Sequence, residues 1–551
     1  MTEGQNPPSG FAIPWWPAIV AIAVWAITES LYLFGYSQAP LGTVFDGFVG
    51  TTDDQNMYFS FIRQSADGHW LFTNRLTHLP HQPALFNLEW LVVGKLMAGL
   101  GGSQRWAYSI WRAIGTATLI FGFWGLACAA LRSQFHRRIA LLMCAFGCGF
   151  GWFFLILEKA GLTAKWPEAM LDLSDAIYPF GQILINPHLS LSHGLSLLFL
   201  AAFIVGEKTE QPRWYGFAAA IAVLHGLIRP YDLILLTGVI PLYCLLESVV
   251  TRRFSWRKLG LRVVPLIAIA PLVGYYVWLF HYHPVFKYWA GQGAVKEMPL
   301  GGHLFSFGVI GLLCAVRLCC FRRYPLNGPA DRLLCVWIAG ALVLVHANKL
   351  PLFSFLPYSP VFGITLVSPM IILAVPLSDA IKNRLANRRV QYLVGVFVVL
   401  IAINSLDSGV WVLKTVYNLR SFPDHYIATT DAQAFDWLNV HSQESDVVLS
   451  TLNTGNRMAK QVSVRMVLGH WSVTPHVREM TRVAEDFYAG EMSPTSAKGF
   501  LNELGAEWIY VGRDEEKLGT IALEDIPGVA LSYANDEVRI YSYTGASNDP
   551  Q

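Results

Sequence analysis

The chain has 551 residues, of which 54% are hydrophobic and only 14% carry a charge. This composition excludes an ordinary soluble globular protein and indicates a polytopic membrane protein. The formal net charge of +2 gives no reason to expect a nucleic-acid partner. All eight cysteines lie at or before Cys335, and their spacing is typical of neither a disulfide framework nor a metal site.

Apolar segments long enough to cross a membrane recur as far as residue 412, and we count about eleven spans. The first is expected to be a retained helix and not a signal peptide, because residues 1–10 contain no basic segment. The run 214–250 is long enough for two spans. We expect it to break at Arg229-Pro230-Tyr231-Asp232, because proline removes a helical hydrogen bond and two charges oppose burial. The other spans are expected near 14–37, 105–131, 139–157, 189–206, 259–282, 303–320, 333–349, 360–380 and 391–412.

Two adjacent carboxylates, Asp53 and Asp54, follow the first span after a short linker. We place them near a helix start, where free backbone N–H groups stabilise anions. Beside a membrane, one carboxylate can take a proton from an acceptor hydroxyl, or the pair can hold a divalent cation next to a phosphate. The alternative is a solvated first turn of a helix, which the pair alone does not exclude. For the base we prefer Asp53, which lies nearer the flexible Gly50-Thr51-Thr52.

The apolar segment 83–101 contains Glu89 and Lys95, and we expect a re-entrant or interfacial helix there and not a span. Basic residues then gather in connections on one side of the membrane, which the positive-inside rule makes cytoplasmic, together with the N-terminus. These residues are Arg132, Arg137 and Arg138; Arg252, Arg253, Arg257 and Lys258; Arg322 and Arg323; and Lys382, Arg384, Arg388 and Arg389. The acid pair and the other polar clusters fall on the outer side, as a site at the outer leaflet requires.

Several cations and histidines lie at the outer ends of spans, where charged donors can hold a lipid phosphate. The common alternative role of such lysines and arginines is snorkelling or topology marking. Arg229 and Lys349 interrupt apolar sequence on the side where cations are disfavoured, so we expect each to have a function. In the run 186–193 we expect a site role for His188, toward sugar hydroxyls, and helix capping for Ser190. The substrate-binding candidates are His188, His225, Arg229, Tyr231, His283, Lys287 and Lys349.

After about residue 424 charged residues become frequent, and the pattern turns to alternating helices and strands. We expect helices at 431–440, 476–488 and 494–504, strands at 446–450, 464–468 and 508–511, and a hairpin of 529–533 with 538–543. This predicts a small α/β domain over 423–551 on the outer side. It follows a transmembrane domain over 1–422 whose outer loop is 38–104.

Several different short motifs are distributed along the chain. They are Asp54-Gln55-Asn56-Met57-Tyr58, Ile62-Arg63-Gln64, Gly68-His69-Trp70-Leu71-Phe72-Thr73-Asn74, Pro187-His188-Leu189-Ser190, Arg229-Pro230-Tyr231-Asp232, Val467-Leu468-Gly469-His470-Trp471 and Gly490-Glu491-Met492-Ser493. Together with an acidic pair in the first outer loop, a many-span core and an outer C-terminal domain, they resemble GT-C-type glycosyltransferases. The closer resemblance is to a bacterial branch of that superfamily. Such proteins often carry arginines after a Leu-Pro-aromatic motif, whereas Leu356-Pro357-Tyr358-Ser359-Pro360 has none. We expect Lys349 to supply that charge instead.

The resemblance implies a lipid-phosphate-linked sugar donor and a reaction on the outer face of the bacterial cell (inner) membrane. We therefore expect an inverting hexosyl or pentosyl transferase that moves a sugar from a polyprenyl-phosphate donor to an acceptor glycan, lipid or protein. Asp53 or Asp54 would deprotonate the acceptor hydroxyl, and Arg229 and Lys349 would neutralise the departing phosphate. A divalent cation is the one cofactor to consider. The competing hypothesis is a non-catalytic transporter or envelope-assembly protein on the same fold.

Overall fold

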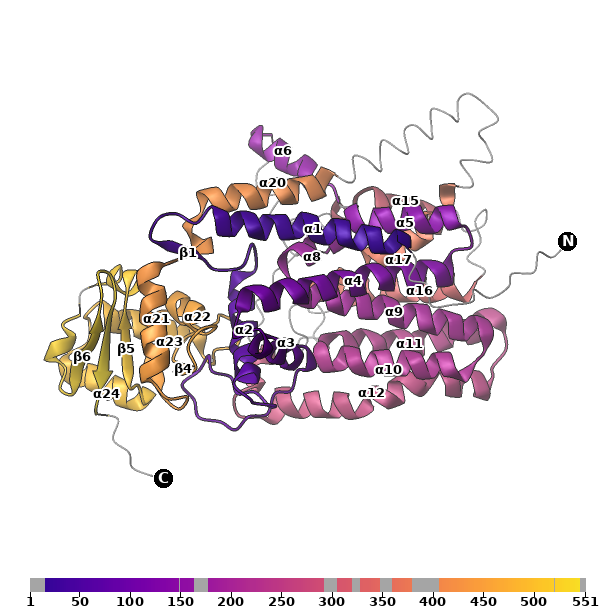
Figure 1. The fold of residues 1–551 in the computed structure, drawn as a ribbon. Helices are drawn as coiled ribbons and strands as arrows, with labels where there is room; N and C mark the ends of the chain where they lie inside the picture. The colour runs from indigo at the N-terminus through magenta and orange to yellow at the C-terminus, as the bar shows by residue number, and fades with distance from the viewer. Residues whose placement is uncertain are drawn as a thin grey trace.

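The computed structural model describes residues 15–147, 149–162, 177–291, 305–319, 328–346, 359–378, 406–519 and 521–545 (Figure 1). A bundle of long helices carries a mixed β-sheet with its own helices at one end. The helices of the bundle and its ends are α1 (Trp15–Ser37), α2 (Thr52–Ala66), α3 (Leu88–Gly99), α4 (Gln104–Ala130), α5 (Gln134–Phe146), α6 (Gly151–Lys159), α8 (Pro179–Ile185), α9 (Pro187–Thr209), α10 (Pro212–Ile228), α11 (Tyr231–Thr251), α12 (Trp256–Tyr282), α13 (Lys287–Gly291), α15 (Gly308–Cys319), α16 (Pro329–Val345), η4 (Ser359–Thr365), α17 (Val367–Ala374) and α20 (Leu406–Ser421).

The described residues contain 6 helical segments that are long and apolar enough to cross a membrane. They are α1, α4, the segment Gln134–Lys159 that holds α5 and α6, α9, α11 and α12. This is the pattern of a multi-pass membrane protein. α10 and α16 have 17 residues each, and the expected span 391–412 lies mostly outside the described residues. The count of about eleven therefore stays a prediction.

The sequence predicted a break within the apolar run 214–250 and a helix in 83–101 that does not span, and the structure agrees with both. α10 ends at Ile228, Arg229 has extended backbone, and α11 begins at Tyr231 after Pro230. This confirms the break within 214–250. In the segment 83–101 the helix is α3, whose 12 residues are too few to cross a hydrocarbon core of about 30 Å. That segment is therefore not a span.

Close packing in the bundle depends on small residues where α4 meets α9. A Cβ atom placed on Gly122 would lie 2.5 Å from the carbonyl oxygen of Gly194, and one on Gly194 would lie 2.5 Å from the backbone of Thr118. Small residues let two membrane helices approach closely enough for their backbones to touch. α9 is thereby held along α4, with its N-terminal residues next to the end of the bundle that carries the sheet.

The described basic connections lie together at the opposite end of the bundle from the sheet (Figure 1). Arg138, after α4, stacks over the rings of Trp15 and Trp16 at the start of α1. Lys258 at the start of α12 pairs with Glu210 at the end of α9 at 2.8 Å. The loops that the sequence placed on one side of the membrane thus meet at one end of the molecule. The connections that contain Arg322 and Lys382 lie outside the described residues.

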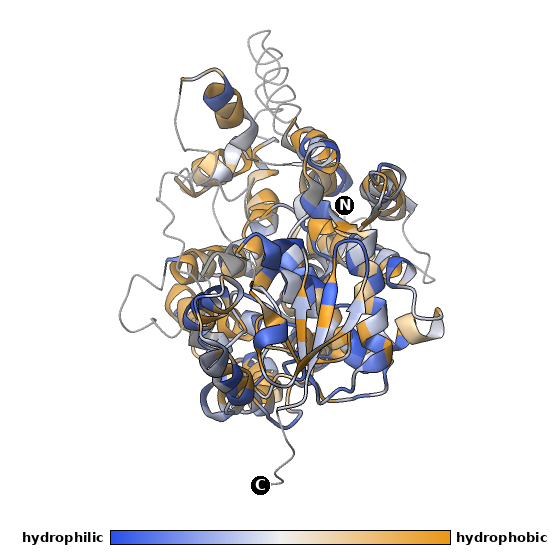
Figure 2. Cartoon of the chain, turned by 90° about the vertical axis from the view of Figure 1, so that its left-hand side faces the viewer, coloured by the Kyte–Doolittle hydropathy of each residue, from blue (hydrophilic) through white to orange (hydrophobic). Residues whose placement is uncertain are grey.

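Residues after α20 form a 5-stranded mixed sheet with strand order β4-β3-β5-β7-β6. Its strands are β3 (Val447–Leu449), β4 (Arg465–Met466), β5 (Trp508–Val511), β6 (Val529–Ala534) and β7 (Arg539–Tyr543). The α-helices of this part are α21 (Thr429–His441), α22 (Leu452–Met458), α23 (Val477–Tyr488), α24 (Pro494–Leu504) and α25 (Arg513–Glu516). Two short 3-10 helices, η5 (Pro423–His425) and η6 (Leu523–Asp525), complete it. β3 runs parallel to β4 and β5, while β7 pairs antiparallel with β5 and β6. The expected strands and the C-terminal hairpin are confirmed. Seen from this end, hydrophilic segments alternate with hydrophobic ones across the sheet and its helices (Figure 2).

The loop between α2 and α3 and the linker after α1 are bonded to this C-terminal part. β1 (Thr43–Phe45) pairs antiparallel with β2 (Tyr426–Ala428), and the backbone N–H of Met466 donates to the carbonyl oxygen of Arg75 at 2.8 Å. Lys460 and Asp46 form a buried ion pair across the same junction. These contacts fix the acid pair of α2 against residues near the end of the chain.

Candidate active site

A cavity of about 390 Å³ opens where the start of α2 faces α22. Thr51 has left-handed backbone (φ 45), α2 begins at Thr52, and both acids lie in its first turn, as the sequence predicted. The cavity is lined by Thr51, Thr52, Asp53, Asp54, Asn56, Asp424, Asn453, Asn456, Arg457 and Trp471. The fold therefore brings the acid pair together with side chains that follow it by several hundred residues.

Asn456 ties the first turn of α2 to the wall of the cavity. Its Nδ2 donates to the carbonyl oxygen of Asp53 at 3.2 Å and to that of Gly469 at 2.8 Å. Its Oδ1 accepts a hydrogen bond of 2.9 Å from Nδ2 of Asn56. Asn56 and Asn456 are buried, so these bonds are shielded from competition with water. The position of the acids is set from the C-terminal part of the chain as well as from their own helix.

Asp54 faces a buried histidine. Nε2 of His470 lies 3.3 Å from Oδ1 of Asp54, and the histidine side chain has no exposed surface. The backbone N–H of Ser472 donates to Nδ1 of His470 at 3.2 Å, so the ring proton belongs on Nε2, on the side of the carboxylate. Asp54 therefore lies at the cavity wall with one carboxylate oxygen next to the buried imidazole.

Asp53 is the freer of the two acids. Its carboxylate faces the cavity, and no residue that the structure describes forms an ion pair or a side-chain hydrogen bond with it. The surrounding protein desolvates the carboxylate and raises the pKa of Asp53, while His470 and Arg457 oppose that rise and Asp54 adds to it. A carboxylate with a raised pKa is a stronger base than an ordinary aspartate. The two acids therefore differ in their surroundings: Asp54 contacts His470, whereas the Asp53 carboxylate is available to accept a proton from a ligand in the cavity.

Arg229 has a protein partner at the break between α10 and α11. Its Nη1 donates to both carboxylate oxygens of Asp232 at 3.1 Å, and Asp232 also contacts Nε2 of His225 at 2.8 Å. All of these side chains are buried. Among the described residues, no hydrogen-bond acceptor pairs with Nε or Nη2 of Arg229. His225 is thereby part of the Asp232 cluster, and Arg229 retains donors for a further anion.

Tyr231 connects this cluster to the acid pair. It lies within electrostatic reach of both Arg229 and Asp54. On α2, Tyr58 is buried and is likewise influenced by Asp54, Arg229 and Tyr231. Both phenol groups therefore lie near Asp54 as well as near Arg229. A shared role of Asp53, Asp54, Tyr231 and Arg229 in one site stays a prediction.

His188 is anchored in the same region by Glu89. Its Nδ1 is hydrogen bonded to the Glu89 carboxylate, which also accepts from Nε1 of Trp111 at 2.6 Å. The ring of Tyr58 on α2 lies 5.3 Å from the His188 ring. Glu89 fixes the imidazole orientation, and Nε2 has no hydrogen-bond partner among the described residues. The predicted capping role of Ser190 is wrong: Asn186 caps α9 by accepting from the N–H of His188, and the Ser190 hydroxyl donates to the carbonyl of Pro187.

None of the described substrate-binding candidates is among the residues that line the cavity, and His283 and Lys287 also lie outside the Asp232 cluster. His283, at the end of α12, accepts backbone hydrogen bonds from Val285 and Phe286 through Nδ1 and caps that turn. Lys287 is exposed beside the ring of Tyr288. Lys349 lies outside the described residues. The described residues contain no group of three His, Cys, Asp or Glu side chains that could hold a metal ion.

Sequence reasoning gave no role to the residues that complete the cavity. Neither Asn456 nor Arg457 stood out in the sequence as a site residue, and His470 and Trp471 were part of a motif with no assigned function. Their sequence signal is only a polar or aromatic residue in the C-terminal part, which is common on any protein surface. They are identified as site residues only because the folded structure places them close to the start of α2.

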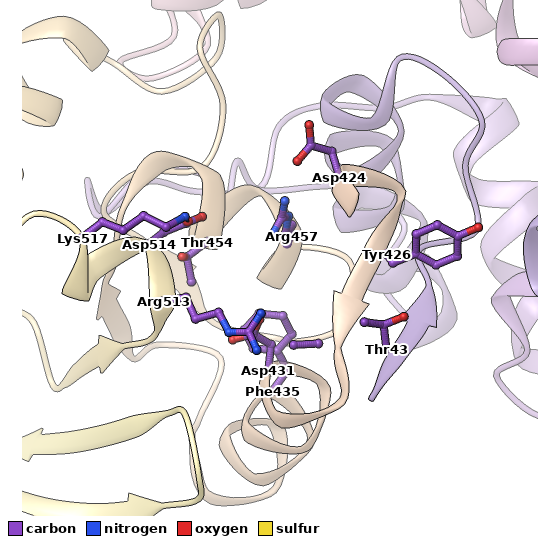
Figure 3. A pocket seen from close by; sticks show the side chains of 11 residues that line it. Thr43, Asp424, Tyr426, Asp431, Phe435, Thr454, Arg457, Arg513, Asp514 and Lys517 are labelled. Atoms are coloured by element: carbon purple, nitrogen blue, oxygen red, sulfur yellow. The ribbon is translucent and has the colours of Figure 1, made fainter. Parts of the chain in front are cut away.

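A second cavity, of about 200 Å³, adjoins the first and shares Asp424 and Arg457 with it. It lies between the β1–β2 pair, α21, α22 and α25 (Figure 3). Its wall carries both acidic and basic side chains: Asp424, Asp431, Arg457, Arg513, Asp514 and Lys517. The acid pair therefore opens into a longer polar surface on the side away from the bundle.

No family model matches the chain, and no curated protein matches it in sequence. Solved structures are similar in fold. ArnT from Cupriavidus metallidurans, bound to undecaprenyl phosphate, matches 98% of this chain and 100% of its own, with TM-score 0.54 and 13% identity. The archaeal oligosaccharyltransferase AglB from Archaeoglobus fulgidus, in complex with an inhibitory peptide and a dolichol-phosphate, matches 91% of this chain and 70% of its own, with TM-score 0.53 and 12% identity.

The arabinofuranosyltransferase AftD from Mycobacteria matches 98% of this chain, which spans only 40% of AftD, with TM-score 0.56 and 14% identity. At such identities the similarity shows the fold. This chain has the fold of GT-C glycosyltransferases, and the resemblance stated from the sequence is confirmed at that level.

Proposed function

We propose that this protein is a membrane glycosyltransferase that moves a sugar from a polyprenyl-phosphate-linked donor to an acceptor on the outer face of the bacterial cell membrane. The observation that carries the proposal is the acid pair at the start of α2, held at a cavity by Asn456 and His470. The fold supports it, because the similar structures include glycosyltransferases with bound polyprenyl phosphates.

In the reaction we propose, Asp53 takes the proton of the acceptor hydroxyl as its oxygen attacks the anomeric carbon of the donor. A new carbon–oxygen bond forms while the bond from that carbon to the lipid phosphate breaks, and the electron pair remains on the phosphate oxygen. Attack from the face opposite the leaving group inverts the configuration. The products are the glycosylated acceptor, the lipid phosphate and a proton that Asp53 releases to water.

Asp54 has a different role in this scheme. Its carboxylate lies beside His470 at the cavity wall, where it can accept a hydrogen bond from a second hydroxyl of the acceptor and position the attacking one. If transfer requires a divalent cation, Asp53 and Asp54 would hold it, since carboxylate oxygens are suitable ligands, and the cation would neutralise phosphate charge.

The departing phosphate gains negative charge and needs donors on the bundle side of the acids. Arg229 is the described residue best suited to this, because Nη1 is fixed by Asp232 while Nε and Nη2 remain for phosphate oxygens. His188 donates Nδ1–H to Glu89, so its Nε2 is an acceptor and is proposed to take a hydrogen bond from a sugar hydroxyl. Lys349 is proposed to join Arg229 at the phosphate. These donors lower the barrier because they act where charge develops.

The test is a comparison of outer-face glycans from cells with and without the protein. We expect the deletion strain to lack a glycosylated product that the wild-type gene restores and the Asp53→Asn gene does not. Glycans identical in both strains would contradict the proposed transfer. Full restoration by both Asp53→Asn and Asp54→Asn would favour a non-catalytic assembly role on the same fold.

A further inference from the structure

The two cavities meet at two charged residues that have no described partner. Asp424 and Arg457 line both cavities, and neither forms an ion pair or a hydrogen bond with a residue that the structure describes. Figure 3 shows both side chains among those that line the second cavity. The other charges of the second cavity are occupied: Arg513 pairs with Glu537, Lys517 with Asp514 at 2.7 Å, and Asp431 accepts from the Tyr510 hydroxyl at 2.6 Å.

An aromatic face completes the first cavity. Trp471 lines it and remains 40% exposed, although it belongs to the segment that carries the buried His470. The indole packs against the His470 ring, with centroids 5.5 Å apart and planes inclined by 30°. A large aromatic side chain held in place yet left open to a cavity is suited to contact a ligand with a flat apolar face.

The lining of the first cavity limits the kind of ligand. Among the described residues that line this cavity there is no aliphatic side chain against which a lipid tail could pack. Asp53, Asp54 and Asp424 place carboxylates on its wall, which disfavours a strongly anionic ligand. Carboxylates accept hydrogen bonds from hydroxyl groups, while arginine and asparagine donate to hydroxyl and ring oxygens.

A sugar ring offers this combination: an apolar face of C–H groups and a rim of hydroxyls. The volume of about 390 Å³ falls within the usual range for small-ligand sites. We infer that the acceptor is a neutral carbohydrate chain, with one ring on Trp471 next to the acid pair and the chain continuing past Arg457 and Asp424 into the second cavity. This inference builds on the proposed function, since it names the acceptor of that reaction.

The experiment measures sugar binding without turnover, on the purified full-length protein in detergent micelles. Saturation-transfer NMR and its titration give dissociation constants for maltotriose, cellotriose and mannotriose, for a galacturonate trisaccharide, and for an uncharged pentapeptide. The variants are Trp471→Ala, Trp471→Phe and Arg457→Gln. The matched controls are Trp256→Ala and Arg213→Gln, which alter an exposed tryptophan and an arginine at the opposite end of the bundle.

We expect the wild type to bind at least one neutral trisaccharide, more tightly than the galacturonate, and to give no signal with the peptide. Trp471→Ala should weaken binding about tenfold or more, Trp471→Phe should retain most of it, and Arg457→Gln should weaken it severalfold. The controls should bind as the wild type does. Absence of binding to all neutral trisaccharides, a preference for the peptide or the galacturonate, or equal affinity in Trp471→Ala and the wild type would overturn the inference.

Failure of this inference is distinguishable from failure of the proposed function. If Trp471→Ala fully restores the glycan missing from a deletion strain, transfer occurs but the acceptor does not use this surface. If sugar binding depends on Trp471 while Asp53→Asn and Asp54→Asn both restore that glycan, the binding site stands and the catalytic proposal fails.

Discussion

Nδ2 of Asn56 donates a hydrogen bond of 2.9 Å to Oδ1 of Asn456, which lies 400 residues later in the chain. Asn456 also donates, through Nδ2, to the backbone carbonyl oxygen of Asp53. A single buried side chain thus joins the helix of the acid pair to the cavity wall built by the C-terminal part. The proposed chemistry depends on this junction, because a base must be held within reach of the proton that it accepts.

The junction predicts a loss of both stability and turnover when Asn456 is replaced. Asn456→Ala leaves the buried amide of Asn56 and the carbonyl of Gly469 without partners, at about 1–3 kcal/mol for each such group. We expect a lower midpoint in thermal unfolding and less product in complementation. Asn453→Ala, an exposed asparagine of the same helix, serves as the stability control. An unchanged unfolding midpoint for Asn456→Ala would contradict the structural role.

Replacing the proposed base should abolish transfer without displacing the protein. Asp53→Asn keeps the shape of the side chain but removes the proton acceptor, and a general base contributes about 10²–10⁴-fold to the rate. Product formation should fall accordingly while the amount of protein in the membrane stays constant. Asp67→Asn alters an aspartate at the other end of α2 and should leave product formation unchanged. Equal activity of Asp53→Asn and the wild type would remove Asp53 from the mechanism.

The pH dependence of transfer should report Asp53. Desolvation raises the pKa of this carboxyl, so protonation inactivates it at a higher pH than an ordinary aspartate. Activity should therefore rise with pH on the acid side of the profile, with a midpoint above the usual aspartate value. His470 lowers the pKa of Asp53, so His470→Gln should move that midpoint to higher pH. His441→Gln, an exposed histidine of α21, is the control. A midpoint that moves to lower pH in His470→Gln would contradict this assignment.

Arg229 should affect stability and donor binding by separable routes. Arg229→Gln leaves buried Asp232 without its arginine, and breaking such a pair costs about 3–5 kcal/mol. The double variant Arg229→Gln with Asp232→Asn removes both charges and should recover part of that stability. Binding of undecaprenyl phosphate by the purified protein should fall about 10- to 100-fold in both variants. A double variant that binds the lipid as the wild type does would show that Arg229 serves only Asp232.

The membrane orientation is tested with a reporter that is active only outside the cytoplasm. Fused after Gln551 it should be active, and fused after Arg137 or Arg388 it should be silent, because basic connections are retained in the cytoplasm. The connections after α4 and after α11 lie at the end of the bundle opposite the sheet (Figure 1), in agreement with this assignment. Activity after Arg137 would place the acid pair on the cytoplasmic side.

The sequence alone predicted the features that depend on short stretches of chain. Hydropathy marked the 6 long apolar helical segments among the described residues, Pro230 marked the break between α10 and α11, and two acids before a helical pattern marked the start of α2. The charges Glu89 and Lys95 indicated that 83–101 does not span, and α3 is short. Each of these follows from a local rule: the solvation of apolar side chains, the missing N–H of proline or the free N–H groups of a first turn.

Only the tertiary structure decided which residues surround the acids and which partner each cation has. Nothing in the spacing of Asn456, His470 or Trp471 points to residues 53 and 54, because hydrogen bonds between distant segments follow no period in the sequence. The pairing of Arg229 with Asp232 and the capping of α9 by Asn186 in place of Ser190 are choices among nearby polar groups that differ by small free energies. Tertiary packing makes those choices, because a buried polar group must find whichever partner the surrounding structure places within reach.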